Sequence, residues 1–270
     1  MTDTTITNRE RSYTLFLLVI VFTSSHVDRQ IVAILQEPIK QAFAISDTQL
    51  GLLTGVMFAF FYATLGMPMA MWADRRDRRN LITFSITVWS AMTALCGAAI
   101  QFWQLLLARI GVGVGEAGSN PPSHSIISDL YGPNERATAM AIFGLGVNFG
   151  VMLGYLIGGW VNEWLGWRWA FVVAGLPGIL IALLVRLTMV EPPRGYADGI
   201  KDRPAAPPFW TVVATMWQNS TLRHLLSANI LISFAGYAVI AWAPVYFQRV
   251  HEMSTGESGS WLAIMIGIGG

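Results

Sequence analysis

Residues 50–79 read LGLLTGVMFAFFYATLGMPMAMWADRRDRR. The part from 50 to 72 has no charged side chain, whereas residues 74–79 hold four arginines and two aspartates. A run of about 20 apolar residues is long enough to cross the hydrocarbon core of a bilayer as a helix. Short loops rich in arginine mark the cytoplasmic side of membrane proteins. The stretch therefore predicts a membrane-spanning helix that ends in a cytoplasmic loop.

The rest of the chain repeats this pattern. It is 54% hydrophobic and 12% charged, with a mean hydropathy of +0.51, whereas soluble domains carry roughly 25% charged residues. An eighth span begins near Gly259, and the other predicted spans cover residues 13–35, 50–72, 81–100, 102–127, 137–161, 169–190 and 225–248. We therefore predict an all-α, multi-pass protein of the lipid bilayer, with the first six helices antiparallel to their neighbours because their connections are short.

A polar segment divides these spans after the sixth. Its prolines are Pro192, Pro193, Pro204, Pro207 and Pro208, and proline-rich polar stretches typically connect structured elements. We predict that residues 1–190 form a six-helix N-terminal transmembrane domain and that residues 191–210 form a cytoplasmic linker. Residues 211–270 then begin a C-terminal transmembrane domain.

A short internal repeat supports two related domains. Residues 46–51 (SDTQLG) precede the second span, and residues 254–259 (STGESG) precede the eighth with the same Ser-to-Gly spacing. Some transporters consist of two parallel six-helix repeats. The run from 263 to 270 is too short to complete a span at about 1.5 Å of rise per residue. We therefore predict about one and a half helices of the second domain, with the rest of that half missing from this chain.

Arginine and lysine residues predict the orientation. The loops on one side hold only Lys40, Arg168 and Arg249, whereas the other side holds Arg9, Arg11, Arg75, Arg76, Arg78, Arg79, Arg136, Arg194, Lys201 and Arg203. An excess of Lys and Arg marks the cytoplasmic side. We predict that the N-terminus, the arginine-rich loop and the linker are cytoplasmic and that the protein lies in the cell membrane.

Several classes of protein do not fit. The net charge is +1 and no basic run is interleaved with aromatic residues, so we predict no nucleic-acid partner. Cys96 is the only cysteine, and His26 and His124 have no second ligand at useful spacing, so we predict neither a metal site nor another cofactor. The sequence contains no nucleophile elbow, phosphate loop or zinc-helix motif, so we predict that the protein is not an enzyme.

The first span contains the polar run TSSHVDRQ at residues 23–30. Charged groups at bilayer depth cost at least about 2.5 kcal/mol and usually face a cavity or a partner. If this helix crosses the membrane, Asp28 and Arg29 lie inside it. The alternative is a helix that ends at Ser24, with Asp28 and Arg29 as interfacial anchors.

The fourth span contains two further charged residues. Arg109 and Glu116 are seven positions apart, so they share one helix face. Antiparallel counting places Asp28, Arg29 and Arg109 in the outer half of the membrane and Glu116 nearer the middle. The charges of these two acids and two bases sum to zero, which lowers the free-energy cost of burying them together. The cluster is either a substrate and proton site or a static structural network.

Glycines form a stripe in the fifth span. Gly146, Gly150, Gly154 and Gly158 recur at every fourth residue. Small residues at this spacing let two membrane helices approach closely. We therefore predict that the stripe packs against another helix.

These motifs resemble the major facilitator superfamily. Its loop between helices two and three has the form G-x-x-x-D-R-x-G-R-R, which Asp74–Arg75 and Arg78–Arg79 match, while Ala70 and Asp77 replace the two glycines. Its fourth-helix pattern R-x-x-x-G is matched by Arg109 and Gly113.

The spinster-like subfamily is a closer resemblance, which covers residues 27–195. It shares the Asp-Arg pair of helix one, the loop form D-R-x-N-R near residues 74–78, G-V-G-E-A at 113–117 and E-P-P-R-G at 191–195. The resemblance implies a major facilitator-type helical bundle, a twelve-helix transporter that works by alternating access, and substrates such as lysolipids or sphingosine phosphates.

The resemblance also implies residue roles. Glu116 is the expected proton site, with Asp28 as the competing carboxylate, and Arg29 and Arg109 line the substrate cavity with them. Asp74 is expected in a latch between the two halves, and to pair with Arg136. We assign to this latch Asp74, Arg75, Arg78, Arg79, Glu135 and Arg136.

Two other functions remain open. A membrane receptor is possible, although the lysines Lys40 and Lys201 lie in polar connections, so no intramembrane Schiff base would form. Within transport, a small organic acid could replace the amphipathic anion, because an arginine pair binds a carboxylate as readily as a phosphate. The expected partners are therefore a small-molecule substrate, protons and the bilayer.

Overall fold

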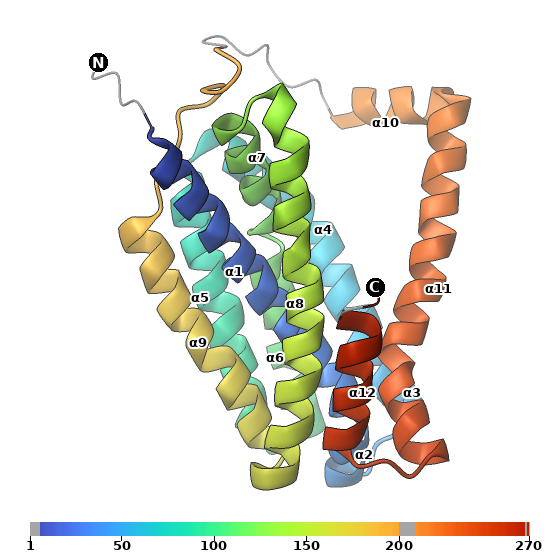
Figure 1. Ribbon diagram of the computed structural model, residues 1–270. Coiled ribbons are helices and arrows are strands. Elements are labelled where there is room, and N and C mark those ends of the chain that lie inside the picture. The colour runs from blue at the N-terminus through green and yellow to red at the C-terminus, as the bar shows by residue number, and fades with distance from the viewer. Residues whose placement is uncertain (1–5, 200–208, 268, 270) are drawn as a thin grey trace.

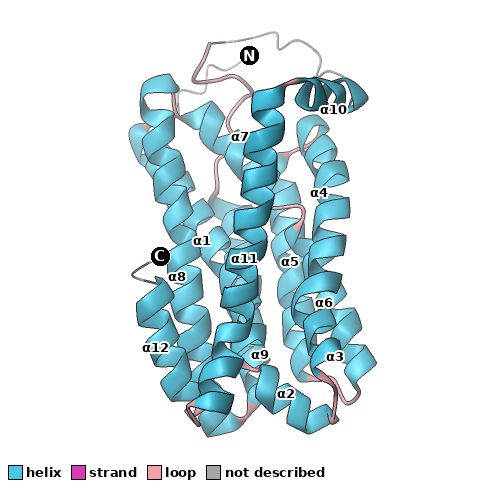
Figure 2. Ribbon diagram, turned by 90° about the vertical axis from the view of Figure 1, so that its right-hand side faces the viewer, coloured by secondary structure: helices cyan, strands magenta, loops and turns pink. Residues whose placement is uncertain are grey.

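The computed structural model describes residues 6–199, 209–267 and 269, and these form a bundle of long helices joined by short connections (Figures 1 and 2). The first half of the chain forms α1 (Asn8–Ile34), α2 (Gln36–Phe43), α3 (Asp47–Gly51), the π-helical turn η1 (Leu52–Val56), α4 (Met57–Arg75), α5 (Arg78–Gly97), α6 (Phe102–Glu116) and α7 (Asn120–Leu130). The second half forms α8 (Pro133–Leu165), α9 (Trp167–Thr188), α10 (Phe209–Gln218), α11 (Ser220–Val250) and α12 (Thr255–Gly267).

Local signals in the sequence start these helices. Thr7 caps α1 with Glu10 in a capping box, and Ser46 does the same for α3 with Gln49. The Asp77 side chain accepts the Asn80 N–H at the start of α5. Helices α8 and α9 are separated by Gly166 at φ 88°, a conformation that favours glycine.

Among the described residues, six helical segments are long and apolar enough to cross a membrane. They are α1, the continuous α3–η1–α4 segment, α5, α8, α9 and α11, and they confirm six of the predicted spans. Helix α1 runs through the polar residues 23–30 without a break, so the alternative that it ends at Ser24 is wrong.

The prediction of one continuous helix over residues 102–127 is also wrong. Helix α6 ends at Glu116, and α7 starts at Asn120 with Pro121 in its first turn. A proline has no N–H to donate and clashes with the preceding turn, so it begins a helix better than it continues one. The fourth crossing is therefore made by two helices, and Glu116 lies at the break between them.

The glycine stripe packs α8 against α1, as predicted. A Cβ atom at Gly146 would lie 3.1 Å from the Val19 carbonyl oxygen, one at Gly150 2.6 Å from the Thr23 oxygen, and one at Gly154 3.0 Å from the Val27 oxygen. At Gly158 the nearest neighbours are the side chains of Ile34 and Ile31. The α8 backbone therefore lies close to the α1 backbone at three successive glycines and against α1 side chains at the fourth.

The last helices pack on the earlier ones. Helix α12 packs on α8, where a Cβ atom at Gly259 would meet the Tyr155 carbonyl oxygen at 2.5 Å. Helix α10, which the sequence analysis did not predict, lies across the end of α11 (Figure 1). Part of the predicted linker, with Lys201, Arg203 and three of its prolines, falls outside the described residues.

Helix α11 contacts the bundle only toward its C-terminal end. Residues 220–239 are largely exposed, whereas Pro244 and Val245 are buried. Figure 1 shows α11 diverging from the other long helices toward the end of the bundle that carries the N-terminus. We call this the near end and the opposite one the far end.

Candidate functional site

The predicted charged residues of α1 and α6 meet in the bundle. The Nε and Nη2 atoms of Arg29 both lie 2.7 Å from Oε2 of Glu116. The Glu116 side chain is 0% exposed and the Arg29 side chain 19% exposed. The cation is therefore the partner that a molecule entering from outside would reach first.

Arg109 and Asp28 complete this group. Nη1 of Arg109 donates to the backbone carbonyl of Asp28 at 3.2 Å, and both side chains are buried. We call Asp28, Arg29, Arg109 and Glu116 the charge site. All four lie within helices that the bundle holds together, α1 and α6.

Several buried polar atoms of the charge site have no hydrogen-bond partner among the described residues. They are both carboxylate oxygens of Asp28, Nε of Arg109 and Oε1 of Glu116. The Thr93 hydroxyl of α5 interacts with the Asp28 side chain, although the contact falls outside regular hydrogen-bond geometry. Buried polar groups in native proteins are nearly always hydrogen-bonded, so these atoms offer binding capacity for protons, water or a polar ligand.

Aromatic residues of α4 face the same cations. The guanidinium carbon of Arg29 lies 5.1 Å from the ring centroid of Phe58 and 4.8 Å from that of Tyr62. The guanidinium of Arg109 lies 5.4 Å from the Phe58 ring. The sequence analysis did not select these residues, because phenylalanine and tyrosine are common in any apolar span.

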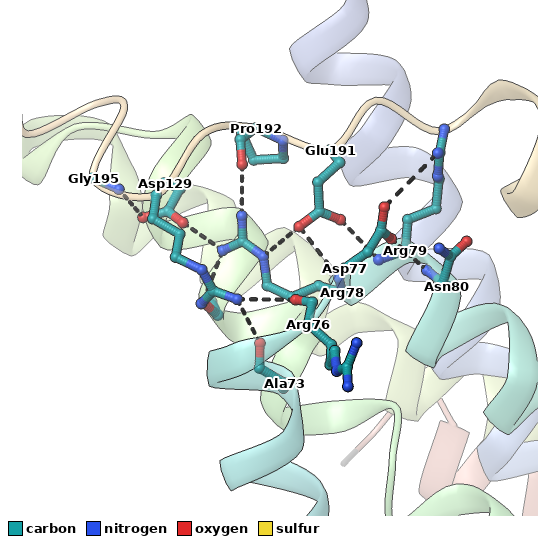
Figure 3. A network of polar contacts seen from close by, with 12 residues as sticks. Ala73, Arg76, Asp77, Arg78, Arg79, Asn80, Asp129, Glu191, Pro192 and Gly195 are labelled. Carbon is teal, nitrogen blue, oxygen red and sulfur yellow. Dashed lines mark hydrogen bonds and ion pairs between the residues drawn. The ribbon is translucent and has the colours of Figure 1, made fainter. Parts of the chain in front are cut away.

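The arginine-rich loop forms a second polar network at the near end (Figure 3). The Arg78 side chain is 1% exposed. Its Nη1 bonds Asp129 and Ser125, its Nε donates to Glu191 at 2.8 Å, and its Nη2 donates to the Pro192 carbonyl at 2.6 Å. Arg78 therefore joins the start of α5, helix α7 and the segment after α9.

Other contacts strengthen this loop network. The Arg79 N–H donates to Glu191 at 2.8 Å, and Arg194 donates to the carbonyls of Ala73 and Arg76. The Gly195 N–H donates to Asp129 at 2.9 Å. Asp74 and Arg75 are exposed at the end of α4. Within the predicted latch, the arginines at 78 and 79 thus bind helix α7 and the segment after α9.

The predicted ion pair between Asp74 and Arg136 is wrong. Nη2 of Arg136 instead lies 2.8 Å from Asp198, because the segment after Gly195 folds back over the α7–α8 junction. Glu135 pairs with Arg11 of α1 at 2.8 Å.

The far end carries an ion-pair cluster that the sequence analysis missed. Arg249 of α11 lies 2.6 Å from Glu37 of α2 through Nε, and its Nη2 lies 2.6 Å from Asp47 of α3. Lys40 also pairs with Asp47, at 2.7 Å. We call these four residues the far-end cluster.

Hydrogen bonds to backbone carbonyls accompany the far-end cluster. Gln36 donates to the Ala241 carbonyl at 2.5 Å, and Gln248 donates to the Ile34 carbonyl at 3.1 Å. The Tyr155 hydroxyl of α8 donates to the Ile240 carbonyl at 3.1 Å. Helix α11 is therefore attached to α1, α2 and α8 at the far end, and it diverges from them at the near end.

The missed charged residues had no distinct signal in the sequence. Asp129 lies two residues beyond the predicted fourth span, 102–127, and Glu37, Asp47 and Arg249 also lie in polar connections. Charge is ordinary in such connections. No group of three or more metal-ligating side chains is brought together among residues 6–199, 209–267 and 269.

Comparison with known proteins shows close similarity to transporters. The family model of the Major Facilitator Superfamily matches residues 15–270. An MFS-type efflux pump of Mycolicibacterium smegmatis is 33% identical over 90% of this chain and 56% of its own length. Protein spinster homolog 1 of Homo sapiens is 31% identical over 83% of this chain and 43% of its own length.

A solved structure has the same fold. It is a bacterial homolog of the human lysosomal transporter Spinster, in an inward-facing and unoccupied conformation. It aligns with a TM-score of 0.85 and 36% identity, over 97% of this chain and 61% of its own. The chain thus spans about half the length of the curated relatives that it matches.

Proposed function

Because the chain belongs to the major facilitator superfamily and is of its spinster-like type, we propose that it carries an amphipathic anion, such as a lysolipid, by proton-coupled alternating access. The superfamily consists of secondary transporters rather than enzymes. The observation that carries the proposal is the buried pair of Arg29 and Glu116 between α1 and α6. A static network would satisfy its polar atoms, whereas Oε1 of Glu116 has no partner among the described residues.

The coupling follows from sharing one cation. An anionic headgroup that binds Arg29 competes with Glu116 for the same guanidinium. A carboxylate that loses its cation inside a bundle is costly to keep charged, so it takes up a proton. When the anion leaves, the guanidinium is free to pair again and the proton is released. The effect is reciprocal, since protonation of Glu116 also frees Arg29 for the anion.

The arrangement of α11 supports alternating access. Its contacts with α1, α2 and α8 lie at the far end, where the far-end cluster joins it to α2 and α3. At the near end residues 220–239 are largely exposed. We propose that the near end is the open side in this conformation and that breaking the far-end cluster accompanies opening of the other side. The exposed Asp74 and Arg75 remain our candidates for a contact between the two halves.

Substitutions in the charge site test the proposal. The complete gene product is reconstituted in vesicles, and the transbilayer movement of lysophosphatidate is followed by albumin extraction, with and without a pH gradient. We expect Glu116→Gln, which mimics the protonated form, to abolish the response to the gradient while binding of the anion persists. We expect Arg29→Ala to weaken binding about 10- to 100-fold, since a charge-assisted hydrogen bond is worth about 1.5–3 kcal/mol.

Matched controls lie outside the charge site. Glu252→Gln and Arg186→Ala remove the same charges at exposed positions and should leave both measurements unchanged. Asp28→Asn tests the competing carboxylate. If the Glu116→Gln protein still moves lysophosphatidate fully in response to the pH gradient, the proton site lies elsewhere. The charge site would then be a static structural network. Gluconate in place of lysophosphatidate tests the organic-acid alternative, and binding of neither anion to the parent would contradict the proposal.

Orientation is a separate proposal. We propose that the near end, with the N-terminus and the arginine-rich loop, is cytoplasmic in the cell membrane. In a Cys96→Ala background, Arg75→Cys should resist an impermeant thiol reagent added to intact cells, and His251→Cys at the far end should react. Cys96 is buried and free, so its removal is a modest change. Labelling of Arg75→Cys from outside intact cells would reverse the proposed orientation.

A further inference from the structure

The aromatic rings of α4 are arranged around the cations of the charge site. The rings of Phe58 and Tyr62 are stacked, with centroids 5.7 Å apart and planes 15° apart. Arg29 lies over both rings, and Arg109 lies over Phe58 alone. The two positions are four apart in sequence, so they share one face of α4.

Glycine in α6 permits this arrangement. A Cβ atom at Gly113 would lie 3.0 Å from the Phe58 carbonyl oxygen and 3.3 Å from its ring. Helix α4 therefore approaches α6 closely at Phe58, beside the turn that carries Arg109. The Phe58 ring is 9% exposed, so it interacts with both guanidinium groups away from bulk water, where a cation–π contact is strongest.

The hydrogen bonds of Arg29 leave it dependent on a second support. Its two contacts at 2.7 Å both go to the same oxygen of Glu116, and its other polar contact is with Tyr62, one of the two ring residues. If Glu116 is protonated, that ion pair weakens and a long side chain with many rotamers would lose its position. The rings attract the guanidinium charge through their π electrons, so this support does not need Glu116 to be ionised.

We propose that Phe58 and Tyr62 are positioning residues for anion recognition, which keep the Arg29 guanidinium in place when Glu116 no longer pairs with it. The inference rests on the proposed function, in which an anion replaces Glu116 at Arg29. It predicts a specific dependence: the rings matter more when Glu116 is neutral than when it is charged. If the rings only filled space, replacing them would weaken anion binding equally whether Glu116 is neutral or charged.

A double-mutant cycle tests this dependence. Binding of lysophosphatidate to the complete gene product in nanodiscs is measured for Tyr62→Leu and Phe58→Leu, each in the parent and in the Glu116→Gln background. We expect binding to weaken about 3-fold in the parent and about 20-fold with Glu116→Gln, the range between an exposed and a desolvated cation–π contact. Phe58→Tyr and Tyr62→Phe keep the rings, so they should bind lysophosphatidate more tightly than the leucine variants in the same background. Equal effects in both backgrounds would overturn the proposal.

A measurement without substrate separates this inference from the proposed function. The Nε–H signal of Arg29 in 15N-arginine-labelled protein, assigned by Arg29→Lys, should be displaced by the ring currents and should move in Tyr62→Leu. Phe60→Leu is the matched control, because Phe60 is on the same helix and 59% exposed. If the parent binds no lysophosphatidate, the proposed function fails on that result alone. If the Arg29 signal does not move in Tyr62→Leu or Phe58→Leu, the aromatic contact is absent and this inference fails.

Discussion

Gly150→Leu is expected to prevent α8 from packing against α1 and to abolish assembly of the bundle. A Cβ atom at this position would lie 2.6 Å from the Thr23 carbonyl oxygen and would also meet the Cβ of His26. The first obstacle is backbone, so no rotamer change relieves it. Overpacking a core with extra methylenes already costs about 1–3 kcal/mol where side chains can move, and here two helices must separate.

The same helix offers a control for this prediction. Gly144 has no atom within 4 Å of an added Cβ, so Gly144→Leu should assemble like the parent. The alanine variants should change thermal stability in opposite directions. Gly144→Ala should raise it, because alanine exceeds glycine in helix propensity by about 1 kcal/mol. Gly150→Ala should lower it, because its Cβ atom already meets the Thr23 carbonyl oxygen. Detergent-solubilised variants are compared by size-exclusion profile and thermal unfolding. A monodisperse Gly150→Leu protein that melts with the parent would show that the stripe does not set the α1–α8 distance.

The glycine stripe illustrates what could be predicted from sequence. A four-residue glycine spacing predicts close packing, because the backbone itself becomes the contact surface. It does not identify the partner, since every span offers a backbone. That α1 is the partner follows from the folded arrangement, in which Val19, Thr23 and Val27 present their carbonyls at the matching spacing.

The charge site was partly predictable for a different reason. Ionisable residues inside an apolar span are expensive, so Arg29 and Glu116 stand out against their surroundings, and antiparallel spans bring them to one region. The contact of Arg29 with Phe58 and Tyr62 was not predictable, because aromatic residues in a span carry no such signal. The break after Glu116 was missed because the predicted span was extended to Ile126 and Ile127. Residues 117–125 between them (AGSNPPSHS) are mostly polar, and Pro121 and Pro122 mark a helix start.

Arg78→Ala is expected to destabilise the first six-span unit by about 3–5 kcal/mol, the usual cost of removing one partner from a buried ion pair. The buried side chain bonds Asp129, Glu191 and the Pro192 carbonyl through three different nitrogens. Without it, the Asp129 carboxylate, whose side chain is 0% exposed, loses the Arg78 guanidinium. The junction between α4 and α5 also loses its attachment to the segment after α9.

Two comparisons make this prediction specific to the network. Arg75→Ala removes the same charge from an exposed site three residues earlier and should melt with the parent. Arg78→Lys keeps the charge but has one compact donor group in place of a planar fork, so it should recover only part of the loss.

A double-mutant cycle identifies the cause of the destabilisation. If the cost of Arg78→Ala comes from burying the Asp129 carboxylate without the Arg78 guanidinium, adding Asp129→Asn should recover stability, because a neutral amide is far less costly to bury than a charge. Thermal unfolding of the four proteins in the same detergent measures the coupling. Strictly additive losses would show that Arg78 and Asp129 act independently, and the loop would then be held by the backbone contacts of Arg194 and Gly195 instead.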